Sequence, residues 1–185
     1  FSAQDTSRGG GLGGVAFSPD GQRLMTGDGA ITSVTIWDAA VTGGGEWASV
    51  VGPAVFTSDS RGLVVGRRNG ALSVLDVETG KRVSTIRPAL RGRDGEVWGM
   101  ELSDDGKLLA TLDPHGVRVV DLSTGATRFT VPWGSADWVM DMRWSHDSEL
   151  LAISWGYDDQ RGQVVVVDRS GAEVARLTEV PGHHT

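Results

Sequence analysis

A short polar turn returns four times in this chain of 185 residues. It reads FSPDG at Phe17–Gly21, and looser copies read FTSDSRG, LSDDGK and WSHDSE. Aligned on the turn aspartate, the copies stand at Asp20, Asp59, Asp105 and Asp147, with separations of 39, 46 and 42 residues. A recurrence at this period indicates that the unit of folding is a repeat of about 40 residues rather than the whole chain.

Two further markers follow the turn in the same order each time. An apolar run closes on an aspartate in VTIWD, LSVLD, VRVVD and VVVVD, which end at Asp38, Asp76, Asp121 and Asp168. A Thr-Gly or Ser-Gly pair comes next and supplies Gly43, Gly80, Gly125 or Gly171. Glycine adopts positive φ without a steric penalty, so each pair predicts a hairpin turn.

The runs between these markers are short and rich in β-branched residues, which predicts strands. Each repeat gives a first strand before the turn, a second after it (RLMTG, GLVVG, LLATL, LLAIS), a third closing on aspartate, and a fourth. The second and third strands are joined through Asp28-Gly29, Asn69-Gly70, His115-Gly116 and Arg161-Gly162. No helix is predicted. Four antiparallel strands per ~40–45 residues is the pattern of a propeller blade, so the predicted fold is an all-β propeller of four blades.

The first strands show a regular alternation. Positions two apart in a strand face the same way, and two such columns are apolar in every repeat: Phe17, Phe56, Leu102, Trp144 and Val15, Ala54, Met100, Met142. The column between them reads Ala16, Val55, Glu101, Arg143 and becomes charged in the last two repeats.

The segment VAFSPDGQRLMTGD, with VTIWD and the Thr-Gly pair after it, resembles the WD-repeat β-propeller family. The resemblance covers about residues 11–177, although only Trp37-Asp38 keeps the family's Trp-Asp pair and the Gly-His pair is missing at the internal blade starts. One asparagine, two lysines and fifteen arginines suggest a divergent, bacterial-looking member. We expect blades at about 11–50, 51–92, 93–134 and 135–180, with 181–185 (PGHHT) opening a further repeat or forming a tail.

The resemblance implies a ring of about seven blades, so we expect four repeats to be part of a larger propeller. A closed ring of four blades is the alternative. An open arc would expose apolar blade faces at both ends, which predicts that more of the same polypeptide or a second copy covers them.

Composition limits the choice of partner. The net charge is −7, and binding to nucleic acid or to an anionic membrane requires a basic surface, so neither is the predicted partner. Residues 61–93 nevertheless hold eight of the seventeen cations and only two anions. The chain has no cysteine, so the compartment cannot be read from disulfides, and no apolar stretch or basic leader predicts a membrane span or signal peptide.

No catalytic motif emerges. Gly9, Gly11 and Gly14 fit a dinucleotide fingerprint but precede a strand instead of opening a helix, so they predict an entry loop. The adjacent His183 and His184 alternate across a strand and are not spaced as zinc ligands. The recurring aspartates are predicted to accept hydrogen bonds from turn backbone, because an active site would break the repeat. No cofactor, metal site or catalytic residue is therefore predicted.

The predicted function is a non-catalytic module that binds a protein or peptide through the loops that differ between blades. Aromatic and arginine side chains are enriched at binding hot spots. The candidate contacts are Trp155, Tyr157, Asp158, Asp159, Arg67, Arg68, Arg91, Arg93, Asp137 and Trp138. Trp155 and Tyr157 are placed in a polar loop over residues 154–162, whereas Trp98 and Trp138 fit equally well as fillers between blades.

Two alternatives remain. A lactonase- or hydrolase-like propeller with a metal in its channel would draw on Glu101, Asp141 and Arg143, the charged residues of the first strands. A half-propeller whose two copies complete one ring is the other.

Overall fold

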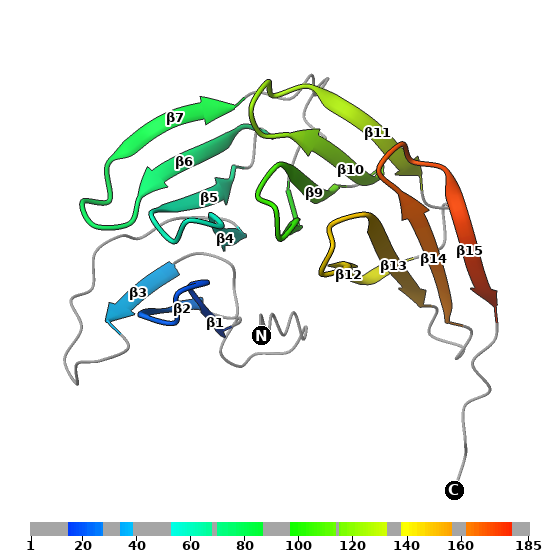
Figure 1. Ribbon diagram of the computed structural model, residues 1–185, viewed down its shortest axis with the longest axis horizontal. Helices are drawn as coiled ribbons and strands as arrows, with labels where there is room; N and C mark the ends of the chain where they lie inside the picture. The colour runs from blue at the N-terminus through cyan, green and yellow to red at the C-terminus, as the bar shows by residue number, and fades with distance from the viewer. Residues whose placement is uncertain are drawn as a thin grey trace, which may run out of the picture. The chain divides into compact units, whose positions relative to one another are not determined.

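The computed structural model describes residues 15–27, 34–38, 53–67, 70–86, 97–113, 115–132, 138–156 and 162–178. Every regular element in these ranges is a β-strand, as the sequence predicts (Figure 1). None of them offers a helix of the length and apolarity that a membrane span would need. The chain divides into two compact units, unit 1 (Phe1–Met100) and unit 2 (Glu101–Thr185).

The strands of the described residues form four antiparallel sheets, each in chain order. The first sheet contains β1 (Val15–Phe17), β2 (Arg23–Gly27) and β3 (Val34–Asp38). The second contains β4 (Ala54–Phe56), β5 (Gly62–Gly66), β6 (Leu72–Asp76) and β7 (Arg82–Ile86). The third contains β8 (Gly99–Leu102), β9 (Leu108–Asp113), β10 (Gly116–Asp121) and β11 (Thr127–Pro132). The fourth contains β12 (Trp138–Trp144), β13 (Leu150–Gly156), β14 (Gln163–Asp168) and β15 (Glu173–Thr178). The predicted fourth strand of the first sheet lies outside the described residues.

The recurring turn between the first two strands has one hydrogen-bond pattern in all four sheets. A serine or threonine hydroxyl donates to the turn aspartate at 2.5–2.7 Å, in Ser18–Asp20, Thr57–Asp59, Ser103–Asp105 and Ser145–Asp147. The same hydroxyl accepts the backbone N–H at the start of the second strand at 2.7–2.9 Å, as Ser18 does from Arg23. The turn aspartates are therefore structural, as predicted.

The residue after the turn aspartate alternates between glycine and serine. Gly21 and Gly106 have φ of 70° and 71°, and Ser60 and Ser148 adopt nearly the same conformation at 60° and 61°. Positive φ is uncommon for serine. Here the serine hydroxyl accepts a backbone N–H of the preceding sheet's turn, from Asp20 to Ser60 at 3.1 Å and from Asp105 to Ser148 at 3.0 Å. This bond between neighbouring sheets offsets the local strain.

The turn between the third and fourth strands is built around the aspartate that closes the third strand. The backbone N–H of Thr79 donates to Asp76 at 2.7 Å, and Asp121 and Asp168 accept equivalent bonds. The following glycines, Gly80, Gly125 and Gly171, have positive φ, which confirms the prediction for the three described pairs.

A β-bulge interrupts each described pairing of third and fourth strands. The register shifts at Val74/Leu75, Val119/Val120 and Val166/Val167. The extra residue of the outer strand is Val83 in β7 and Val174 in β15, which are 69% and 53% exposed. Bulges twist an edge strand and discourage pairing with another chain, so they protect these sheet edges.

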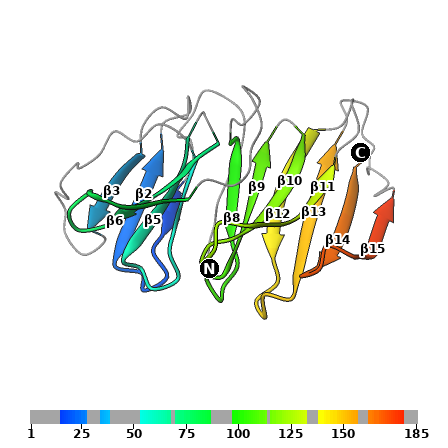
Figure 2. The same ribbon diagram turned by 90° about the horizontal axis from the view of Figure 1, so that it is seen from above.

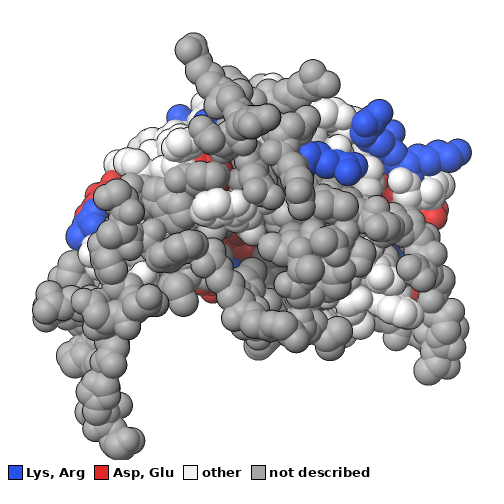
Figure 3. Space-filling view, turned by 180° about the vertical axis from the view of Figure 1, so that it is seen from behind, with Lys and Arg blue, Asp and Glu red and all other residues white. Residues whose placement is uncertain are grey.

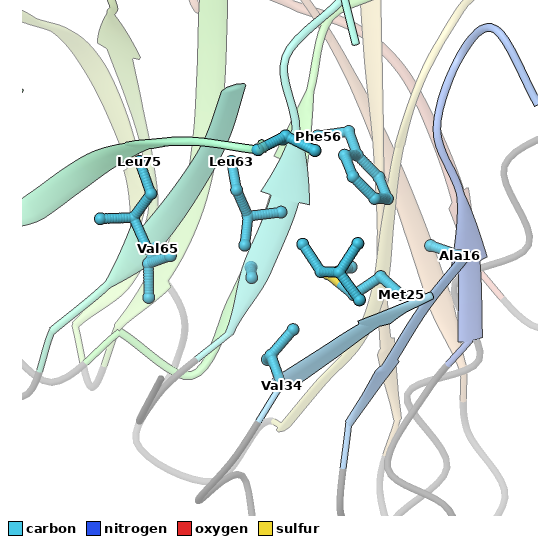
Figure 4. Close-up of a cluster of buried hydrophobic side chains, with 10 residues drawn as sticks. Ala16, Met25, Val34, Phe56, Leu63, Val65 and Leu75 are labelled. Atoms are coloured by element: carbon cyan, nitrogen blue, oxygen red, sulfur yellow. The ribbon is translucent and has the colours of Figure 1, made fainter. Parts of the chain in front are cut away.

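In unit 1 the first and second sheets share one apolar core (Figure 4). Met25 and Ile36 of the first sheet lie in the same buried cluster as Phe56, Leu63 and Leu75 of the second. Cross-strand partners such as Leu63 and Leu75 point to the same face of the sheet, so the period of two places one apolar face of each sheet in this core.

In unit 2 the third and fourth sheets stand side by side, β9–β11 next to β12–β15 (Figure 2). Leu109, Val119, Leu151 and Ile153 are all 0% exposed. Trp144 of β12 donates its indole N–H to the backbone carbonyl of Glu101 at 3.3 Å. This hydrogen bond fixes the first strands of the two sheets against each other.

Candidate functional site: unrepeated polar groups on the blades

Three of the predicted contact residues lie within the described ranges. The sequence predicted Trp155 in a loop, but this prediction is wrong. Trp155 lies in β13, which continues to Gly156, and it is only 9% exposed. Pairing of Trp155 with Gln163 extends the hairpin and turns this side chain into the core. Trp138 begins β12 and pairs with Gly156. Arg67 follows β5, half-buried, and its Nε donates to Oγ of Ser73 at 3.3 Å.

The other predicted contacts fall outside the described residues. They are Tyr157, Asp158, Asp159, Arg68, Arg91, Arg93 and Asp137.

Glu101 on β8 and Asp141 and Arg143 on β12 form a charged group that we call the Glu101 cluster. Nη1 of Arg143 lies 2.6 Å from Oδ1 of Asp141 and 3.8 Å from Oε2 of Glu101. The same nitrogen donates to the carbonyl oxygen of Met142 at 2.7 Å. Glu101 is 8% exposed, whereas the side chain of Asp141 is 45% exposed. The guanidinium of Arg143 therefore lies close to one buried carboxyl group and one exposed carboxyl group.

The environment of Glu101 favours its neutral form. Burial raises the pKa of the Glu101 carboxyl to about 7, and the attraction of Arg143 only partly offsets this effect. The nearby carboxylates of Asp141 and Asp104 also raise the pKa. A carboxyl with this pKa exchanges its proton near neutral pH, whereas the pKa of Asp20, Asp59, Asp105 and Asp147 is lowered.

This pKa predicts a pH-dependent stability. The folded chain binds the Glu101 proton more tightly than the unfolded chain, so the free energy of unfolding falls as pH rises from about 4.5 to about 7. The cost at pH 8 is on the order of 3 kcal/mol. Glu101→Gln is expected to remove this slope and to be more stable than the natural chain at pH 8. Urea unfolding at several pH values measures the pH dependence of the free energy of unfolding for both chains. The exposed Glu78→Gln serves as the control, and a slope that survives in Glu101→Gln contradicts the assignment.

A second polar group that does not recur occupies the hairpin between β9 and β10. Oδ2 of Asp113 accepts hydrogen bonds from Nη2 and Nε of Arg118 at 3.0 and 3.3 Å, and Oδ1 accepts the backbone N–H of His115 at 2.8 Å. Asp113 is only 2% exposed. By sheet register, the same two positions hold Arg67 and Ser73 in the second sheet. The end of the second strand is therefore a position where one blade differs from the next.

The recurring carboxylates, in contrast, are used within the turns. Hydrogen bonds from a neighbouring hydroxyl and from backbone N–H groups hold the pKa of Asp20, Asp59 and Asp147 below the usual value. Burial works against this shift at Asp105, but bonds from Ser103, Lys107 and Arg169 outweigh it, and its pKa is also lowered. Within the described ranges, no three His, Cys, Asp or Glu side chains are grouped as metal ligands.

Basic side chains gather on one part of the surface. Lys and Arg side chains are concentrated at the upper right of Figure 3, on the side where β7 lies. Arg82 in β7 and Lys81 before it are exposed and belong to the basic segment of residues 61–93. Of the described cations of this segment, Arg61, Lys81 and Arg82 are therefore exposed at the surface.

Comparison with known proteins adds a relative and a solved structure. The chain is 31% identical over 122 residues to WD repeat-containing protein SL1-17 of Schistosoma mansoni. This alignment covers 64% of this chain and 38% of that protein. It resembles the hydrazine synthase structure of Kuenenia stuttgartiensis with a TM-score of 0.70 and 22% identity, over 89% of this chain and 48% of that one. At this identity the second likeness supports the fold alone. No protein-family model matches the chain.

The chain thus spans less than half the length of both of these proteins. Three observations nevertheless agree: the markers recur four times, the described strands form antiparallel sheets in chain order with the same turns, and the curated relative is a WD-repeat protein. Together they show a β-propeller fold whose repeats are similar to those of a WD-repeat protein.

Proposed function

We propose that this propeller is a non-catalytic interaction module that binds a protein or peptide segment through the loops and hairpin ends that differ between blades. The observation that carries the proposal is the division of polar groups: every described turn aspartate is used by its own turn, and polar groups that do not recur occupy the hairpin ends. Binding sites on rigid scaffolds are commonly made by such variable loops.

The proposed contacts come from four segments. Tyr157, Asp158 and Asp159 follow β13, in which the neighbouring Trp155 is buried. Arg67 and Arg68 follow β5, and Arg91 and Arg93 follow β7. Asp137 precedes β12 in the sequence, and Trp138 is the first residue of β12. The arginines belong to the basic segment and suit an acidic stretch of the partner, because guanidinium groups bind carboxylates in two-pronged fashion.

Selection from a displayed peptide library on the folded chain tests the proposal. The dissociation constant of a selected peptide is then measured by calorimetry. We expect either the double variant Arg67→Ala/Arg68→Ala or the triple variant Tyr157→Ala/Asp158→Asn/Asp159→Asn to raise it at least tenfold, about 1.4 kcal/mol, which is typical of a hot spot. Val83→Ser, a change at an exposed residue of β7 that belongs to none of these segments, is the control. Failure to obtain a peptide, or peptides insensitive to both variants, would count against the proposal.

The alternative of a metal-dependent propeller hydrolase draws on one observation, the buried Glu101 whose pKa lies near neutrality on a first strand. Arg143 already supplies a positive charge to Glu101 and Asp141, where a metal would have to bind. Calorimetric titration with Mg²⁺, Ca²⁺ and Zn²⁺ separates the two functions. Saturable binding that is lost in Glu101→Ala would support the enzyme, and we expect none.

A further inference from the structure

Three cations of the second sheet, Arg61, Lys81 and Arg82, lie together at one corner of unit 1, which we call the basic corner. Arg61 precedes β5, and Lys81 and Arg82 lie where the turn after β6 enters β7 (Figure 1). The carbonyl oxygen of Arg61 accepts the backbone N–H of Val77 at 2.9 Å. The carbonyl oxygen of Lys81 accepts that of Asp76, also at 2.9 Å. Neighbouring strands lie about 4.8 Å apart, so the three cations span roughly 10 Å of the sheet edge.

The side chains of the basic corner are exposed and form no ion pair with another residue of the described ranges. The turn carboxylates beside them are used by their own turns. Asp59 accepts the hydroxyl of Thr57 at 2.6 Å, and Asp76 accepts that of Thr79 at 2.7 Å. Cations in the corresponding turns of the third and fourth sheets are paired, in contrast, at 3.8, 2.8 and 3.0 Å in Lys107–Asp105, Arg128–Asp121 and Arg169–Asp105.

The basic corner does not recur in the other sheets of four strands. Equivalent positions follow from the strand register and from the backbone hydrogen bonds of the turns. The third sheet has Lys107, Ala126 and Thr127 at these positions, and the fourth has Glu149, Ala172 and Glu173. The turns fold in the same way with cations, neutral residues or anions there, so the fold does not require the charges of the second sheet.

We propose that the basic corner binds an acidic segment of a partner protein. Guanidinium groups bind carboxylates in bidentate pairs, and Arg61 and Arg82 present two of them. Alternate side chains of an extended segment face the same way about 7 Å apart, so two acidic residues of one segment reach both arginines. Nucleic acid or an anionic membrane requires a wider basic surface than three cations on a chain of net charge −7.

This surface is distinct from the contacts proposed above. Arg61 precedes β5 and Arg67 follows it, so the two residues lie at opposite edges of the second sheet. At about 3.3 Å per residue they are roughly 20 Å apart. The basic corner is therefore a second surface, which can be tested separately from the first.

Fluorescence anisotropy of a labelled peptide of alternating glutamate and serine tests this proposal on the whole chain. Binding is expected at about 0.05 M salt and should weaken toward about 0.3 M, because salt screens exposed charges. The triple variant Arg61→Gln/Lys81→Gln/Arg82→Gln should raise the dissociation constant at least tenfold.

The matched control is Lys107→Gln/Arg128→Gln/Arg176→Gln, which removes the same charge from exposed cations that are already paired. It should change the dissociation constant less than twofold, and circular dichroism checks that both variants fold.

Three results would overturn the proposal. The first is no binding of the peptide, or equal effects of the two triple variants. The second is binding that is lost in Arg67→Ala/Arg68→Ala but kept in the basic-corner variant, which would support the contacts of the proposed function and reject this surface. The third is a short single-stranded DNA that binds more tightly than the peptide through the same three cations, because the corner would then be a nucleic-acid surface.

Discussion

Replacing Leu109 by alanine is expected to lower the free energy of unfolding by about 2–5 kcal/mol. Leu109 lies in the middle of the third sheet, pairs with Val120 and is 0% exposed. Truncation removes apolar contacts and leaves a cavity that rigid neighbouring strands cannot fill by moving. Chemical denaturation followed by tryptophan fluorescence measures the loss.

The control for this prediction is Val83→Ala. Val83 is an apolar strand residue too, but the bulge in β7 leaves it 69% exposed. Its truncation is expected to change stability by less than about 0.5 kcal/mol. Equal effects of the two substitutions would mean that Leu109 is not in a packed blade core.

Gly116→Ala is expected to be at least as damaging, with a loss of more than about 3 kcal/mol. Gly116 begins β10 with φ of 142°, where residues with a side chain are strained. A Cβ at this position would lie 2.2 Å from the carbonyl oxygen of Val131 and 3.0 Å from Cα of Pro132. These atoms belong to the backbone of β11, so the clash cannot be relieved by rotating a side chain.

Gly162→Ala provides the matched comparison. Gly162 precedes β14 in the equivalent hairpin, and its added Cβ would meet only the carbonyl oxygen of Trp155 at an ordinary 3.6 Å. Thermal unfolding of both variants should show a large fall in Tm for Gly116→Ala and little change for Gly162→Ala. Similar Tm values would contradict the close approach of β10 and β11.

The repeat markers predicted the strands and turns because each marker has a local physical cause. An aspartate that accepts turn N–H groups and a glycine with positive φ act within a few residues, so their spacing alone defines hairpins. The described second and third strands begin at the predicted residues, except that β10 and β14 begin one residue earlier. The bulges in the pairing of the third and fourth strands were not predicted, since no residue type marks them.

Structural features that depend on residues far apart in the sequence could not be predicted in the same way. The polar segment after Trp155 suggested a loop, but pairing with Gln163 carries β13 past this residue and buries the indole. Ser60 and Ser148 are turn residues by sequence, and nothing in the sequence indicates that the hydroxyl of each accepts a backbone hydrogen bond from the neighbouring sheet. The sequence showed Glu101 and Arg143 as charged residues in otherwise apolar positions of the first strands. That they form an ion pair depends on the packing of β8 and β12, which belong to different sheets.

The central claim is that hydrogen bonds within the turns hold the recurring carboxylates in their charged form, whereas burial raises the pKa of the unrepeated Glu101. A carboxyl ¹³C NMR titration of the intact chain tests both halves in one experiment. The account predicts that Asp20, Asp59, Asp105 and Asp147 titrate below the usual 3.8, and that Glu101 titrates near 7. Turn aspartates at or above their usual value, together with Glu101 near its usual 4.5, would contradict it.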